Sequence, residues 1–342
     1  MHDISDREKL ILRSIIRQYI DTAKPIGSAQ IAAMGATKLK SASIRRIMAS
    51  LEEKGYLTHP HTSAGRIPTA SGYRFYVDEL MQKNKVLPGK EKPIRRAIES
   101  YDGDVDLLMG KLARVLASLS NQLGIVVTPR LYQSVFDRMD IVPVSADKLM
   151  VIIKVQDGYV KSILVEIRHK LNRRRLNPVV RKINQRLHGR TLMEIKDHFR
   201  HLVADLRNDD TGLVRLFMDF SDRLFDFRRY ENYALNGTSN IVTKPEFMNA
   251  ERFSMLVDLL ENKNVVIHLM EERDYPPGMK VTIGNENKPA PIHTCSVVTS
   301  TYFMGNVAGV LGIIGPMRMP YELVIPLVEY TAREITSKFR SI

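Results

Sequence analysis

The residues best suited to chemistry lie in one basic segment, Ser41 to Asp78. Its first part has the spacing of a helix, and two arginines and two small residues share one face: Ala42, Arg45, Arg46 and Ala49. Apolar residues share another face: Ile44, Met48 and Leu51. Arginine is the side chain that most often reads guanine in the major groove, and neighbouring alanines let a helix approach the bases closely. The pattern predicts a DNA-contacting helix, although two arginines alone would favour a merely solvated face.

The residues after this helix have the order of a β-wing. Gly55 ends the helix, Tyr56 to Thr58 predict a short strand, and Ile67 to Thr69 predict the returning strand. The intervening tip is rich in hydroxyl groups and ends in Arg66. Hydroxyls, backbone amides and arginine are groups that contact phosphates. His59 and His61 have no Cys, His or Asp cluster near them in sequence, so we expect no metal site.

From these patterns we predict a set of DNA-contacting residues across the first 80 positions. They are Ser28, Lys40, Ser41, Ser43, Arg45, Arg46, His61, Thr62, Ser63, Arg66 and Arg74. The order of helix, wing and flanking helices is that of a winged helix-turn-helix, which places one helix in the major groove.

The sequence also predicts the helices that surround this segment. Ser5 to Glu8 has the spacing of a capping box before a first helix, and Pro25 and Gly27 break the chain before a short helix that Ser28 can cap. Three aromatic residues predict a closing helix that packs on the head: Tyr73, Phe75 and Tyr76. We therefore assign residues 1–80 to a winged-helix domain and the Pro-, Gly- and cation-rich residues 81–100 to an exposed basic linker.

The remainder predicts an α+β multidomain chain. Strand patterns occur at 149–153, 163–165, 265–269 and 281–283, a hairpin at 296–304 and 307–314, and a closing helix at 321–339. Residues 171–262 between them are mainly helical in pattern. We expect one α+β domain in two parts, 101–170 and 263–342, interrupted by a helical insertion at 171–262.

Charge and composition limit the function further. The 342 residues carry a net charge of +13, which favours polyanionic partners, but residues 1–80 contribute only +4 whereas residues 166–190 contribute +8. The basic run at 173–175 has no assigned role: a solvated surface is favoured over an additional phosphate contact or a docking site for an acidic partner. No apolar run has the length of a membrane span, and the start of the chain lacks a signal core, so we expect a cytoplasmic protein with no membrane partner.

Cys295 is the only cysteine. We expect it to be buried in a strand, and no catalytic constellation or cofactor is expected.

Three segments resemble the HrcA family of bacterial heat-inducible transcription repressors. They are GYLTHPHTSAGRIPTASGYRFYVD at Gly55–Asp78, IGNENKPAPIHTCSVVTSTY at Ile283–Tyr302 and GIIGPMRMPY at Gly312–Tyr321. Because they lie at both ends, the resemblance covers essentially the whole chain. It implies a winged helix, a GAF-like domain and a dimerising domain inserted into the GAF-like one. It also implies a homodimer on the double-stranded inverted-repeat operator CIRCE, upstream of chaperone operons, and dependence on the GroEL chaperonin.

The resemblance is weakest at the DNA-contacting helix. The family's helix begins near Ser-Pro-Ala-Thr-Ile-Arg-Asn, and this chain has Ser41, Ser43 and Arg46 at the family's Pro, Thr and Asn. Arginine prefers guanine whereas asparagine prefers adenine, so a change of operator preference of about 1–3 kcal/mol at one base pair is expected. A second interpretation is a transcription regulator gated by a small effector bound in the GAF-like domain, which fold analogy alone suggests.

Overall fold

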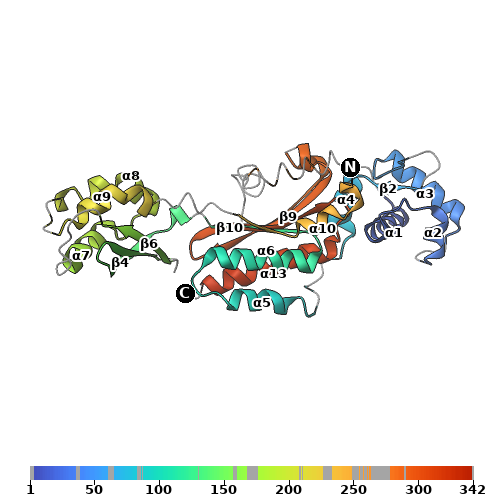
Figure 1. The fold of residues 1–342 in the computed structure, drawn as a ribbon. Helices are drawn as coiled ribbons and strands as arrows, with labels where there is room; N and C mark the ends of the chain where they lie inside the picture. Colours follow the sequence, from blue (N-terminus) through green and yellow to red (C-terminus); the bar gives the residue numbers. More distant parts are fainter. Residues whose placement is uncertain are drawn as a thin grey trace.

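The computed structural model describes residues 4–340 except for several gaps. The gaps are 36–38, 61–64, 83–85, 87, 130, 157–159, 168–175, 208, 210, 226–232, 249–253, 255–256, 258–259, 261, 263–277 and 289. The expected strand at 265–269 and the basic run at 173–175 therefore lie outside the described residues. The described chain is a mixed α+β structure with helices at the N-terminal end and two larger β-sheets (Figure 1).

The N-terminal end, which we call the head, consists of helices around a small hairpin. Its elements are α1 (Asp6–Thr22), α2 (Ser28–Ala33), α3 (Ser41–Glu53), β1 (Leu57–Thr58), β2 (Ile67–Pro68), α4 (Ala70–Phe75) and a π-helical turn (Tyr76–Leu80). The predicted capping box is present, because Ser5 and Glu8 cap α1 reciprocally. The expected cap of α2 is wrong: Gly27 occupies the N-cap position and Ser28 is the first helical residue.

The middle of the molecule is a five-stranded antiparallel sheet of order β7-β3-β10-β9-β8. Its strands are β3 (Leu123–Val127), β7 (Tyr233–Asn236), β8 (Met279–Ile283), β9 (Cys295–Met304) and β10 (Val307–Pro316). Helices α6 (Val105–Ser120) and α13 (Tyr321–Arg340) cover one face, with α5 (Glu91–Glu99) beneath them (Figure 1). The short α10 (Thr238–Val242) follows β7. We call this assembly the body.

A third unit lies at the opposite end of the molecule from the head (Figure 1). It contains a separate sheet of order β4-β5-β6, formed by β4 (Phe136–Ser145), β5 (Lys148–Val155) and β6 (Val160–Glu166). The same unit contains three helices: α7 (Leu176–Leu187), α8 (Leu192–Leu202) and α9 (Leu213–Leu224). Backbone hydrogen bonds join the start of β4 to the α7–α8 turn: Phe136 N donates to Arg190 O at 2.8 Å and Gly189 N donates to Phe136 O at 3.2 Å.

This arrangement corrects two expected boundaries. Strands β4 to β6 were expected in the first part of the α+β domain at 101–170, but they pair with one another and belong to the distal unit. Strand β7, expected in the insertion at 171–262, pairs with β3 in the body. The expected linker also contains α5, where Ile94, Ala97 and Ile98 are buried. These apolar positions outweigh the neighbouring cations because they pack the helix onto the body.

Several local predictions are confirmed. The hairpin turns at Gly305 and Asn306, with Met304 paired to Val307. The closing helix is α13, and Cys295 is buried at the start of β9, where burial raises the pKa of its thiol to about 12.

Candidate nucleic-acid interface

Helix α3 has the two faces that its spacing predicts. Ile44 and Leu51 are fully buried and Met48 is 5% exposed, so this face packs into the head. The opposite face, at the N-terminal half of the helix, is exposed: Lys40, Ala42, Ser43, Arg45 and Arg46. Within the described part of the chain neither Arg45 nor Arg46 has an acidic partner at ion-pair distance. Both guanidinium groups are therefore available to an external anion.

A serine pair links the beginnings of α2 and α3. The Ser28 and Ser41 hydroxyl oxygens lie 2.9 Å apart, and Ser28 is 8% exposed. This hydrogen bond joins the N-terminal ends of the two helices. The Ser28 hydroxyl therefore has an internal hydrogen-bond partner, whereas Ser43 is exposed to solvent.

Glu8, on α1, connects that helix to the C-terminal end of α3. One Glu8 carboxylate oxygen accepts hydrogen bonds from Lys54 Nζ at 2.8 Å and from Ser50 Oγ at 2.8 Å; the other accepts from Ser5 N and Ser5 Oγ. Burial alone would raise the pKa of Glu8, but the hydrogen bonds from Lys54, Ser5 and Ser50 outweigh burial and lower it to about 2. Glu8 is therefore ionised and positions α3 on α1. The capping-box spacing indicated only its bond to Ser5, because Ser50 and Lys54 are distant in sequence.

The base of the β1–β2 hairpin, which is the predicted wing, is fixed on both sides. Backbone bonds of 2.9 Å join Ile26 and Arg66 in both directions, and the Arg66 Nη2 lies 2.7 Å from Glu52 Oε2 in the last turn of α3. His59 contacts the other oxygen of the same carboxylate. A Cβ atom on Gly65 would lie 2.5 Å from the Ile26 carbonyl carbon, so only glycine permits this close approach. The predicted contacts His61, Thr62 and Ser63 lie outside the described residues.

Arg74 differs from the other predicted contacts, because its guanidinium faces the body. Its Nε donates to Glu286 Oε1 at 2.9 Å and its Nη2 donates to the Val281 carbonyl at 2.7 Å. Nη2 also contacts Glu286 Oε2. The sequence around Arg74 does not reveal these partners, which lie more than 200 residues away.

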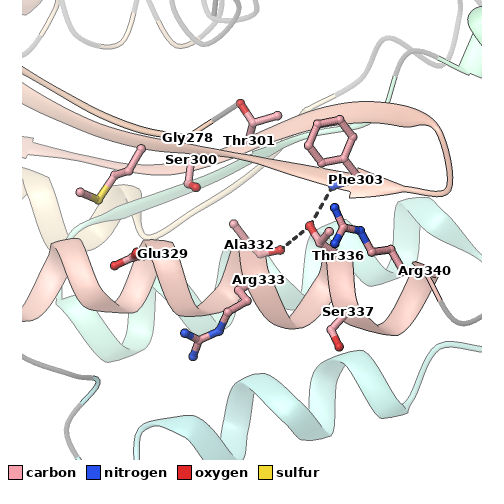
Figure 2. Close-up of a pocket in the computed structure, with 11 residues that line it drawn as sticks. Gly278, Ser300, Thr301, Phe303, Glu329, Ala332, Arg333, Thr336, Ser337 and Arg340 are labelled. Carbon is pink, nitrogen blue, oxygen red and sulfur yellow. Dashed lines mark hydrogen bonds between the residues drawn. The ribbon is translucent and has the colours of Figure 1, made fainter. Parts of the chain in front are cut away.

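The body has an open groove of about 550 Å³ between α13 and the edge formed by β8 and β9 (Figure 2). Its polar groups do not converge on one point: Arg333 extends below α13, away from the strands, whereas Arg340 lies beside Phe303 and Thr336 (Figure 2). The Thr336 hydroxyl is already used, since it accepts from Phe303 N at 3.0 Å and donates to Ala332 O at 2.8 Å. This geometry does not define an effector site.

The described residues contain no group of three or more His, Cys, Asp or Glu side chains placed to hold a metal ion. Among the helices that the structure describes, none combines the length and apolar character needed to cross a membrane.

Comparison with known proteins identifies the family. The family model "HrcA protein C terminal domain" matches residues 106–325. The chain belongs to the HrcA family. The heat-inducible transcription repressor HrcA of Chlorobium phaeobacteroides is 38% identical over 98% of both chains, and that of Geobacter sulfurreducens is 33% identical over 98% of both chains. These HrcA relatives are transcription repressors and not enzymes.

A solved structure supports the same fold. A crystal structure described only as that of a hypothetical protein superposes with a TM-score of 0.71 and covers 99% of both chains at 24% sequence identity. At this identity the likeness concerns the fold alone.

Proposed function

We propose that this HrcA-family chain is a homodimeric repressor of heat-shock chaperone operons that binds a CIRCE-type inverted repeat in double-stranded DNA. The single observation that carries the proposal is the exposed face of α3 with Arg45 and Arg46, neither of which has an acidic partner among the described residues. Glu8 anchors the C-terminal end of this helix. In this proposal the head is a winged helix-turn-helix, α3 enters the major groove, and the wing contacts the flanking backbone. The exposed Lys40 and Ser43 belong to the same surface.

The distal unit supports the homodimer. One face of its three-stranded sheet is buried. The other face presents exposed apolar side chains: Val142, Val144, Val160 and Leu164. Val142 and Leu164 both pair with Met150, so they are neighbours across β5. Exposed apolar patches of this kind mark association surfaces. We propose that a second copy of the chain covers this face, that the body is the GAF-like domain, and that the distal unit is the dimerising insertion.

The proposal includes the regulatory partner implied by the family resemblance. GroEL-type chaperonin would bring the repressor to its active form, and unfolded protein that occupies the chaperonin would relieve repression. The corresponding test compares operator binding by the purified dimer before and after incubation with chaperonin and ATP. An active fraction that rises supports this dependence, whereas an unchanged fraction contradicts it.

The Arg46→Ala variant tests the DNA-reading role most directly. Its binding free energy on the operator should weaken by about 1–3 kcal/mol. The variant should also distinguish less well between bases at one base-pair position. Arg96→Ala is the matched control, because Arg96 is an exposed arginine on α5 in the body. Fluorescence anisotropy on the operator and on single-base-pair variants measures both quantities. A loss below about 0.3 kcal/mol, or an equal loss on every duplex, would reject Arg46 as a base contact.

A further inference from the structure

The head and the body are in direct contact, in addition to being connected along the chain. Residues of α1 and α4 contact β8, the turn after it and the start of α13. Arg17 donates to the Glu322 carboxylate at 2.6 Å, and Tyr76 donates to the same oxygen at 2.9 Å. Arg318 of the body donates to the Ile20 carbonyl at 3.3 Å. These contacts form one surface, which we call the docking surface.

Buried aromatic packing makes the docking surface rigid. Tyr73 is 1% exposed and its ring lies 6.0 Å from the ring of Tyr321, centroid to centroid. The Tyr321 hydroxyl is held by Ser296 Oγ at 2.6 Å and donates to Met317 O at 2.7 Å. A Cβ atom on Gly284 would lie 3.1 Å from Ala70 Cβ, so the two backbones approach closely at this point.

Arg74 and Glu286 form the directional part of the docking surface. The guanidinium contacts both oxygens of the carboxylate and one backbone carbonyl, and such a fork fixes orientation as well as distance. Burial would raise the pKa of Glu286, but the hydrogen bond from Arg74 and that from Ile283 N lower it, so the carboxylate is ionised.

The turn that carries Glu286 is itself fixed. The buried Asn287 side chain donates to the carbonyls of Gly284 at 2.9 Å, Ile292 at 3.2 Å and Cys295 at 3.0 Å. Its amide oxygen accepts from Thr282 Oγ1 at 2.6 Å. All four hydrogen-bond partners of the Asn287 side chain belong to the body. The body therefore holds the turn that presents Glu286 to the head.

We propose that Arg74, through Glu286, is a positioning residue that fixes the direction of each DNA-reading head on the body and thereby sets the half-site spacing that the dimer accepts. This inference rests on the proposed function. A dimer reads two half-sites at a geometrically defined separation. A domain held only by a flexible tether of about ten residues would move over about 17 Å, roughly half a helical turn of DNA. The docking surface removes that freedom.

The test separates positioning from direct DNA contact. Binding of Arg74→Ala is measured on the inverted repeat, on repeats with a spacer lengthened by about five base pairs (half a helical turn), and on an isolated half-site. The native protein should prefer the native spacer by at least about tenfold, and Arg74→Ala should reduce this preference to under about threefold with unchanged half-site affinity. Arg95→Ala is the matched control, because Arg95 pairs with Glu334 inside the body.

The paired substitution Arg74→Glu with Glu286→Arg should restore part of the spacer preference, because it restores the ion pair although not the bond to Val281 O. Full spacer preference in Arg74→Ala would overturn the inference. A parallel loss of half-site affinity would also overturn it, since Arg74 would then be a phosphate contact.

A measurement without DNA keeps the inference testable if the proposed function fails. Hydrogen exchange by mass spectrometry should show α4 and β8 exchanging at least about threefold faster in both Arg74→Ala and Glu286→Ala, and unchanged in Arg95→Ala. Unchanged exchange in the two variants would show that the pair does not hold the head. Failure of the native protein to bind any inverted repeat would instead reject the proposed function.

Discussion

Glu8 provides the sharpest test of how α3 is held. Its pKa is about 2 in the folded chain against an ordinary value of 4.5. This difference corresponds to about 3 kcal/mol of stabilisation of the head by the ionised form. Because the folded pKa is the lower one, this stabilisation is complete above pH 4.5 and is lost as the pH falls from 4.5 toward 2. Linkage predicts a loss of about 2 kcal/mol by pH 3.

The perturbation is Glu8→Gln in the full chain, and the assay is hydrogen exchange in peptides of α1 and α3, corrected for intrinsic rates. At pH 7 the variant should open these helices up to about a hundredfold more often, and at pH 3 the ratio should fall to about tenfold or less. Glu194→Gln is the matched control, since Glu194 closes an equivalent capping box at the start of α8 in the distal unit. A ratio below threefold at pH 7, or the same ratio at both pH values, would refute this account of Glu8.

Two further predictions concern the proposed wing and the proposed dimer. Arg66→Ala should weaken binding to all duplexes similarly and reduce the slope of log affinity against log salt by about 1; an unchanged slope would show that Arg66 serves Glu52 alone. Leu164→Glu should raise the dimer dissociation constant at least about tenfold in analytical ultracentrifugation, because it places a charge in the exposed sheet face. Met193→Glu, at a 40% exposed position on α8, is its control, and equal dissociation constants in the two variants would exclude this face from the dimer.

The head was predictable in detail because its signals are local. Capping-box spacing, the Gly55 stop and the period of Ile44, Met48 and Leu51 each act within a few residues, and the observed α1, α3 and hairpin follow them. Strand existence was equally readable for β8, β9 and β10. These elements depend on propensity and pattern within one segment.

Long-range pairing was not readable in the same way. The alternation of β5 fits a half-buried strand in either sheet, and nothing in residues 148–155 says that its partners are β4 and β6 and not β3. Side-chain partners were unreadable for the same reason. Arg74 is among the predicted DNA contacts, and nothing near it in sequence indicates Glu286, which binds it from the other end of the chain.

The most direct test of the central claim is fluorescence anisotropy of the purified full chain, with and without chaperonin and ATP, on a CIRCE-type inverted repeat and on a scrambled duplex across a salt series. The protein should prefer the repeat by at least about a thousandfold, and this preference should persist at physiological salt. Equal and steeply salt-dependent binding to both duplexes, unchanged by chaperonin, would contradict it.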